Sequence, residues 1–379
     1  VGADDGNYEN IYENDQWENV PAAVAYGVSA DYSPRVRYWS NGAWSAEETR
    51  GTAGTTIDVV EAEYCPIAER NNEWIFVVGD NGGYLDVYVH LDNGSWIENA
   101  DLMSLNANAT LTREHGFDIK YEQKSGEALL VGTDGVTAGV IKYRVWNGQT
   151  WGAEQTYTIS GATDVIYVIR MASDPTSNDI ALIATTNASE VVAAIWDGDT
   201  NSWTTSTLLN SAGIYNRDYW CFDVIYESQS GWAIFAYATA TPDIVDNRWD
   251  GSAWQGGSTI VVGASATALE LESDPASDNI MLAYWDDTNG QLSAIVWDGN
   301  NWGSVTALDT SASATGLAKH FDIAWEPQGG KLLAVWDVSI PGQRLYYNTW
   351  TNTAGWGTED SIITANKSFT STVRLSHLG

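Results

Sequence analysis

The chain has 379 residues, of which 44% are hydrophobic and 18% charged, and its formal net charge is −33. So strong a negative charge repels polyanions, so neither nucleic acid nor an anionic membrane surface is an expected partner. No run of apolar residues reaches the roughly 18 that a membrane-spanning helix needs, so membrane insertion is not expected either.

The N-terminal residues 1–18 are acidic and show no strand pattern, so we expect them to form an arm or linker. The segment 21–26 (Pro21-Ala-Ala-Val-Ala-Tyr26) is typical of a second strand that has no first strand before it. We therefore expect the folded domain to span residues 19–379.

A turn flanked by large apolar residues then recurs along the whole chain at intervals of about 50 residues. Its second flanking residue is always tryptophan. The seven copies are Trp39–Trp44, Leu91–Trp96, Trp146–Trp151, Trp196–Trp203, Trp249–Trp254, Trp297–Trp302 and Trp350–Trp356. A period of this length that contains strand patterns indicates a repeat architecture.

One repeat shows the pattern of strands most clearly. Residues 117–122 (Phe-Asp-Ile-Lys-Tyr-Glu) alternate in polarity, residues 128–131 form a short apolar run, and residues 139–146 form a third strand. Asn147-Gly148 is a tight hairpin turn, and Trp151 opens a fourth strand. Four antiparallel strands without helical periodicity between them predict a propeller blade.

Two kinds of repeat alternate. One ends its first strand with Tyr-Glu or Trp-Glu, as at Glu122, Glu227 and Glu326, and the other with Ser-Asp-Pro, as at Asp174 and Asp274. The duplicated unit is therefore interpreted as a pair of blades of about 100 residues.

The C-terminal residues 372–376 (Thr-Val-Arg-Leu-Ser) resemble a first strand with no blade after it. Paired with residues 21–27, they would complete one blade and leave no open sheet edge. The predicted fold is thus all-β, a single seven-bladed β-propeller of four-stranded antiparallel blades that is closed by the N- and C-terminal strands.

The repeat resembles the seven-bladed propeller superfamily in general. Its Trp-Asp-Gly-x-x-Trp turns also resemble the blade turns of fungal and bacterial propeller lectins, over about four residues per repeat. That resemblance implies binding of carbohydrate. From the residues alone, the turn tryptophans have two interpretations: platforms that stack on sugars, or wedges that hold adjacent blades together.

When the first strands of the repeats are aligned, the second residue of each strand is charged. We call this set of residues the charged column. Its members are Glu61, Asp118, Arg170, Asp223, Glu270, Asp322 and Arg374. First strands border the central channel of a propeller, so the column should ring the mouth of that channel. It is either a belt of salt bridges that holds the blades in register, or a site for a ligand or a Ca²⁺ ion at the consecutive carboxylates Asp223, Glu270 and Asp322.

The loops that enter the third, fifth and seventh blades add basic and aromatic groups on the same face. They contain His115, Arg217, Trp220 and His320. Together with Asp118, Asp223, Glu270 and Asp322, these residues are the predicted ligand-binding set. The alternative is that they only decorate solvated loops.

Other signals are weak. The turns at 197–201 and 286–290 are rich in aspartate and asparagine but do not fit a calcium-binding loop, so no cofactor is required and Ca²⁺ remains an option. Cys65 and Cys221 fall three repeats apart and are expected to be free thiols. No nucleophile, zinc or phosphate-loop motif of a known enzyme class occurs.

The sequence therefore favours a secreted or cell-surface binding or adhesion module, not an enzyme, which recognises a glycan or an extracellular protein through one face of the propeller. One alternative is a polysaccharide lyase or hydrolase that uses His115, Arg217, Tyr219 and His320. Another is a structural building block of an extracellular filament or surface layer.

Overall fold

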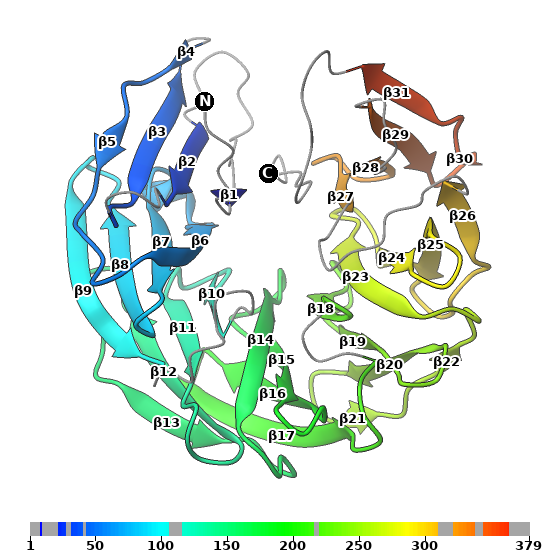
Figure 1. The fold of residues 1–379 in the computed structure, drawn as a ribbon, viewed down its shortest axis with the longest axis horizontal. Helices are drawn as coiled ribbons and strands as arrows, with labels where there is room; N and C mark the ends of the chain where they lie inside the picture. Colours follow the sequence, from blue (N-terminus) through cyan, green and yellow to red (C-terminus); the bar gives the residue numbers. More distant parts are fainter. Residues whose placement is uncertain are drawn as a thin grey trace.

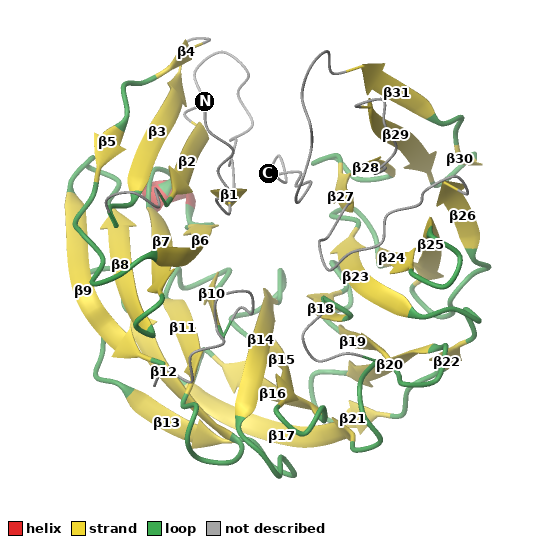
Figure 2. Ribbon diagram, in the orientation of Figure 1, coloured by secondary structure: helices red, strands yellow, loops and turns green. Residues whose placement is uncertain are grey.

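The computed structural model describes residues 8–9, 22–27, 32–40, 43–105, 116–215, 220–309, 321–337 and 344–363. These residues form seven antiparallel sheets that are arranged around a central axis (Figure 1). Apart from one short 3₁₀ helix, Ala68–Arg70, the described elements are all strands (Figure 2). The all-β prediction is confirmed.

The sheets are numbered here in chain order. Sheet 1 comprises β1 (Tyr8–Glu9), β2 (Ala22–Tyr26), β3 (Arg35–Ser40), β4 (Ala43–Trp44) and β5 (Glu48–Thr49). Sheet 2 comprises β6 (Ile57–Tyr64), β7 (Trp74–Asp80), β8 (Tyr84–His90) and β9 (Trp96–Ser104). Sheet 3 comprises β10 (Phe117–Tyr121), β11 (Ala128–Thr133), β12 (Val140–Trp146) and β13 (Gln155–Thr158), and sheet 4 comprises β14 (Ile166–Ser173), β15 (Ile180–Thr186), β16 (Val191–Asp197) and β17 (Ser202–Asn210).

The remaining sheets repeat this order. Sheet 5 comprises β18 (Phe222–Tyr226), β19 (Ala233–Ala238), β20 (Ile244–Trp249), β21 (Trp254–Gln255) and β22 (Thr259–Ile260). Sheet 6 comprises β23 (Ala266–Ser273), β24 (Asn279–Asp286), β25 (Gln291–Asp298) and β26 (Thr306–Asp309). Sheet 7 comprises β27 (Phe321–Trp325), β28 (Lys331–Asp337), β29 (Arg344–Thr351), β30 (Gly355–Trp356) and β31 (Asp360–Ile363).

Each sheet runs outward from the axis in the order of its strands. From sheet 2 to sheet 7, the first strand lies nearest the centre (Figure 1), and the first strands of neighbouring sheets contact one another in turn. The second strands of sheets 2 to 5 are buried on both faces, since every residue of β7, β11, β15 and β19 is buried. The hydrophobic core therefore lies between the sheets, as it does between propeller blades.

Sheet 1 differs from the prediction at its inner edge. We expected residues 372–376 to pair with β2, but β2 is hydrogen-bonded there to β1, with Tyr8 opposite Tyr26 and Glu9 opposite Ala25. A strand of two residues shows no alternation, so the sequence pattern of the N-terminal segment gave no sign of it. Residues 372–376 lie outside the described part of the chain.

The recurring turn is confirmed as the hairpin between the third and fourth strands, with one correction. In six sheets the flanking tryptophans sit opposite each other in the pairing, as Trp146 and Trp151 do. In sheet 2 the residue opposite Trp96 is His90 and not Leu91, because Leu91 belongs to the turn and its N–H bonds to the carbonyl of Ser95.

Neighbouring sheets are joined by hydrogen bonds from buried tryptophans to buried carboxylates. The indole of Trp196 in sheet 4 donates to Glu122 of sheet 3 (3.0 Å), and the indole of Trp297 in sheet 6 donates to Glu227 of sheet 5. Both carboxylates directly follow the inner strand of the preceding sheet. The Tyr-Glu repeats of the sequence thus supply the acceptor, and the turn tryptophan of the next sheet supplies the donor.

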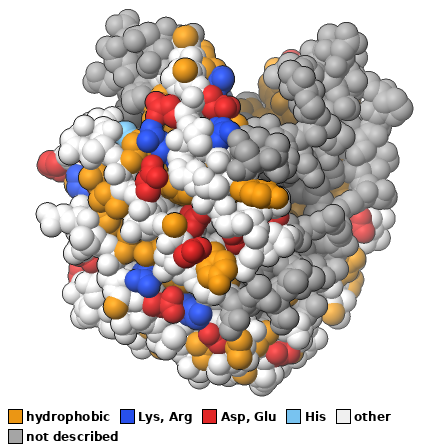
Figure 3. Space-filling model, turned by 60° about the vertical axis from the view of Figure 1, so that its left-hand side comes forward, with side chains coloured by type: hydrophobic (Ala, Val, Ile, Leu, Met, Phe, Trp, Pro, Cys, Tyr) orange, Lys and Arg blue, Asp and Glu red, His pale blue; other side chains and the backbone are white. Residues whose placement is uncertain are grey.

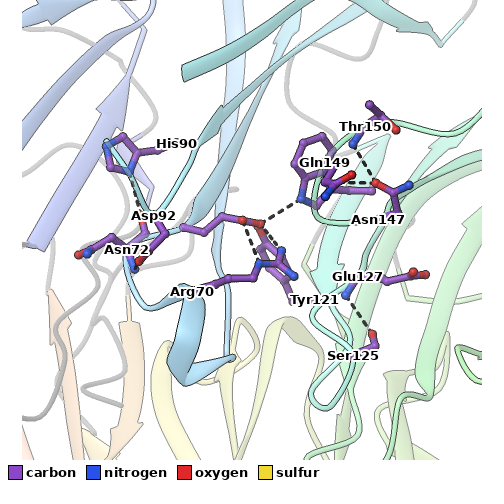
Figure 4. A network of polar contacts seen from close by, with 12 residues as sticks. Arg70, Asn72, His90, Asp92, Tyr121, Ser125, Glu127, Asn147, Gln149 and Thr150 are labelled. Carbon is purple, nitrogen blue, oxygen red and sulfur yellow. Dashed lines mark hydrogen bonds and ion pairs between the residues drawn. The ribbon is translucent and has the colours of Figure 1, made fainter. Parts of the chain in front are cut away.

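A third such bond uses a different carboxylate. Glu73, directly before β7, accepts from the indole of Trp146 (3.0 Å) and from the Tyr121 hydroxyl (3.0 Å) of sheet 3, and it pairs with Arg70 (Figure 4). Glu73 is 2% exposed, so these donors supply its hydrogen bonds in place of water. We call these contacts the indole–carboxylate bonds.

Cys65, directly after β6, and Cys221, directly before β18, are buried and form no disulfide, which confirms that they are free thiols. Burial raises the pKa of the Cys65 thiol to about 11. The thiol form is therefore retained at neutral pH, and both residues act as small core side chains.

The indole–carboxylate bonds predict a specific loss of stability. Glu122→Ala leaves the buried indole N–H of Trp196 without its acceptor and should lower the free energy of unfolding by about 1–3 kcal/mol. Glu154→Ala, at an exposed position, should change it by less than about 0.5 kcal/mol. Urea unfolding of both variants measures the difference; equal stabilities would contradict a role for the bond.

Candidate functional site

The charged column is brought together as predicted in the six sheets that the structure describes at this position. Each member pairs with the fourth core residue of the neighbouring second strand: Glu61 with Val77, Asp118 with Val131, Arg170 with Ile183, Asp223 with Ala236, Glu270 with Ala283 and Asp322 with Val335. One register position on equivalent inner strands places the six residues around the axis, each three residues before the last residue of its strand. Arg374 lies outside the described residues.

The aspartates of the column bind the backbone of the next sheet. Asp118 accepts hydrogen bonds from the N–H of Ile119 (2.7 Å) and from the N–H of Met171 in sheet 4 (2.6 Å). Asp223 repeats this geometry with Val224 (3.0 Å) and with Leu271 in sheet 6 (3.0 Å). Each carboxylate therefore bridges its own inner strand and that of the following sheet.

Arg170 forms its ion pair with one neighbour only. Its guanidinium lies 3.5 Å from Asp223 and stacks over the Trp220 ring at 4.2 Å. No ion pair between Arg170 and Asp118 is found in the described part of the chain, so Arg170 does not link Asp118 to Asp223 as a continuous belt of salt bridges would require. The cation of Asp118 is Lys120, which lies on the same face of β10 two residues further along and also pairs with Glu63.

Lys120 is a residue that the sequence reasoning missed. The alternation of β10 could have revealed it, because residues 118 and 120 share one face of the strand. Burial raises the pKa of the Asp118 carboxyl, and the ammonium of Lys120 opposes that rise. At Asp118 and Asp223 the column is thus held by backbone N–H groups and by two cations, Lys120 and Arg170.

Trp220 lies at the end of sheet 5 where its inner strand begins. It directly precedes the segment that leads into β18, and its carbonyl accepts a hydrogen bond from the N–H of Leu269 at 2.5 Å. The indole is partly exposed and packs against the core of sheets 6 and 7. Arg170 therefore contacts both Trp220 and Asp223, which joins three of the residues that the column and the entry loops contribute.

The other predicted loop residues cannot be placed. His115, Arg217 and His320 lie outside the described residues, as does Tyr219. Glu270 and Asp322 occupy their expected positions on β23 and β27. Asp322 is buried at 4% exposure, so its carboxylate faces protein more than solvent.

The turn tryptophans divide into two roles. The first member of each pair is buried in sheets 3 to 7, between neighbouring sheets, and the second is partly exposed, with ring centroids of paired indoles 5.3–5.6 Å apart in sheets 3 to 6. Trp44, at 39% exposure, presents the most open ring among these turns. The wedge interpretation is supported for the first tryptophans, and the second ones retain surface that a ligand could contact.

The two turns that resembled calcium loops use their aspartates internally. Asp286 accepts hydrogen bonds from the backbone N–H and the side-chain amide of Asn289, and Asp197 accepts from the N–H of Thr200. No group of three or more His, Cys, Asp or Glu side chains within the described ranges is arranged to hold a metal ion.

No described helix is long and apolar enough to cross a membrane.

Charged side chains are spread over the surface and do not form one large patch on the face shown in Figure 3. One face shows acidic side chains interspersed with fewer basic ones and with scattered hydrophobic groups (Figure 3). The basic groups that are described sit largely against carboxylates or aromatic rings; Arg50, for example, pairs with Glu48 and Glu98 and stacks over Trp96.

Comparison with solved structures supports the propeller fold. The BP39L lectin of Burkholderia pseudomallei matches with a TM-score of 0.61 at 13% identity, over 94% of this chain and 98% of the lectin. A lectin of Aleuria aurantia with a six-bladed β-propeller fold and fucose recognition (TM-score 0.43, 12% identity, 80% and 96% of the two chains) and a Hadza microbial sialidase (0.40, 13%, 77% and 66%) match too weakly for an argument. No protein-family model matches the sequence, and neither does any curated protein. At 13% identity, the first match shows a shared fold and leaves the function open.

The belt predicts that Asp223 is needed for stability. Asp223→Asn keeps one acceptor oxygen but loses the second and the charge beside Arg170, so it should cost about 1–3 kcal/mol. The matched control is Asp250→Asn in the hairpin turn of the same sheet. There, hydrogen bonds with Ser252 and Ala253 hold the pKa of the carboxyl at about 2, and an amide oxygen can accept the same bonds from both N–H groups. Thermal unfolding of both variants measures the effect; equal losses would contradict it.

Proposed function

We propose that this chain is a secreted or cell-surface, non-enzymatic carbohydrate-binding module that recognises its glycan at the face where the inner strands begin. The observation that supports this most is the fixed cluster of Trp220, Arg170 and Asp223 at that face. Sugars are bound by aromatic rings that stack on their C–H faces and by charged groups that fix their hydroxyls.

The cluster is organised before a ligand arrives. Arg170 holds the plane of the indole, Asp223 holds Arg170, and the bond from the Leu269 N–H holds the backbone of Trp220. A side chain that is already ordered loses little entropy on binding, which favours affinity for a weak ligand such as a single sugar ring. The predicted partners His115, Arg217 and His320 would approach from the adjoining entry loops.

No cofactor is required in this proposal. The carboxylates of Asp118 and Asp223 already accept backbone N–H groups, so they have less capacity to coordinate Ca²⁺. A protein ligand in place of a glycan, a polysaccharide-degrading activity at the same face and a structural role in a filament are the alternatives. The first and the third predict that the parent protein binds no glycan in the experiment below.

For the fold, we propose that the seven sheets are seven blades of a closed ring. The indole–carboxylate bonds run from Glu122 to sheet 4 and from Glu227 to sheet 6. Glu326 occupies the same position after β27 in sheet 7, and its partner in a closed ring would be the turn tryptophan of sheet 1, Trp39. Closure would leave no inner strand edge open to association with other chains.

The binding proposal is tested on a glycan array, with and without calcium. The parent protein should bind a limited set of glycans in both conditions, and Trp220→Ala should weaken binding at least about tenfold, since an aromatic contact typically supplies one to two kcal/mol. The control is Trp232→Ala, another tryptophan of sheet 5 that is 36% exposed at the opposite end of the sheet, directly before β19. Equal losses for both variants, or no binding by the parent, would contradict the proposal.

The closure proposal is tested by a double-mutant cycle of Trp39→Phe and Glu326→Ala. A bond between the two residues should give a coupling energy of about 1 kcal/mol in urea unfolding. In an open array Glu326 contacts only Lys331, so the two changes should then be additive.

A further inference from the structure

The junction between sheets 4 and 5 repeats the junction between sheets 2 and 3, with one side chain shortened. Glu73 directly precedes β7, and Asp179 directly precedes β15. Both residues also receive the same backbone bond through their carbonyls, from the N–H of Cys65 and of Asp174 respectively. Asp179 is therefore the structural counterpart of Glu73, with one methylene fewer.

The same two donor residues, a tyrosine and a tryptophan, recur at both junctions. Tyr121 and Trp146 are the last residues of β10 and β12, and Tyr226 and Trp249 are the last residues of β18 and β20. At the first junction, both donors reach a single oxygen of Glu73, at 3.0 Å each (Figure 4). Because Tyr226 and Trp249 hold the matching positions on matching strands, we infer that Tyr226 Oη and Trp249 Nε1 also point toward one place, next to Asp179.

At the second junction these two donors have no acceptor among the described residues. Tyr226 is 2% exposed and Trp249 is 7% exposed. A buried donor without a partner typically costs about 1–3 kcal/mol. The third junction of this kind, between sheets 6 and 7, avoids the cost differently, because the indole of Trp325 donates to the carbonyl of Glu272.

Nearby carboxylates do not satisfy the donors. Asp174 accepts from Thr176 and Ser177, and the shorter Asp179 falls one methylene short of the place that the Glu73 carboxylate occupies. Burial and the charges of Asp197, Asp174, Asp199 and Glu122 raise the pKa of Asp179 to about 6. No arginine corresponds to Arg70 here, so the surroundings are negative.

We propose that one buried water molecule binds at this junction, accepting hydrogen bonds from Tyr226 Oη and Trp249 Nε1 and donating one to Asp179. The chemistry selects water: two donors require an acceptor, the surrounding carboxylates exclude an anion, and a cation could not accept the hydrogen bonds. Three polar partners are the usual complement of an internal water. The missing methylene of Asp179 supplies the room that the water occupies.

The first test is a pair of hydroxyl deletions in the full chain, followed by urea unfolding. Tyr121→Phe removes a bond to Glu73 and calibrates the loss. If a water accepts from Tyr226, then Tyr226→Phe should lower the unfolding midpoint by a similar amount, roughly a few tenths of a molar. An unchanged or raised midpoint would show that the hydroxyl has no partner and would overturn the proposal.

The second test is structural. A high-resolution crystal structure of the parent should show one water within hydrogen-bond distance of Tyr226 Oη and Trp249 Nε1. In Asp179→Glu, the water should be replaced by a carboxylate oxygen that accepts from both donors, as Glu73 does. Absence of the water from the parent, or its persistence beside Glu at position 179, would contradict the proposal.

Discussion

The structure depends on hydrogen bonds that cross from one sheet to the next at buried positions. The second strands of sheets 2 to 5 are buried on both faces, and apolar packing alone would let neighbouring sheets slide. An indole N–H fixed to one carboxylate oxygen permits a single relative position, because a buried donor that loses its acceptor is costly. Glu73, Glu122 and Glu227 therefore set the register between sheets as well as contributing to stability.

The inner strands are held by a second set of hydrogen bonds between sheets, in which a carboxylate again accepts from a buried donor of the next sheet. Asp118 and Asp223 accept the backbone N–H of the following sheet's inner strand, so the channel wall is fixed near the proposed binding face. The cluster around Trp220 is thus attached to a rigid support. A residue such as Asp223 contributes both to the fold and to the proposed site. The stability of a variant at such a residue must therefore be measured before a change in its binding is interpreted.

Much of the fold was predictable because each repeat contains a hairpin turn rich in tryptophan, glycine and asparagine, and these residues identify a hairpin from local sequence alone. The strand order, the register of the charged column and the free cysteines follow from that pattern. The acceptors of the indoles were not predictable, since Glu122 and Trp196 lie 74 residues apart and nothing local relates them. Variation in turn length hid His90, and the two-residue strand β1 was too short to show alternation.

The site was predictable only in part. Alternation along β10 and the other inner strands located the carboxylates. It did not show that these carboxylates would accept hydrogen bonds from backbone N–H groups of the next sheet. The sequence analysis did not name Lys120 as the cation beside Asp118, although alternation along β10 places both residues on one face of the strand. The contact between Trp220 and Arg170 joins two sheets and had no signature in the spacing of residues.

The spacing of the indole–carboxylate bonds also bears on how the chain acquires its structure. Each bond closes a loop of about one and a half repeats, so a sheet needs only its immediate neighbour to be completed. Order can then spread along the chain from any pair of sheets, as in linear repeat arrays, with every added sheet docking onto a finished face. Because no sheet has to form first, a chain that began and ended at a different inter-sheet loop could still assemble the same arrangement of sheets.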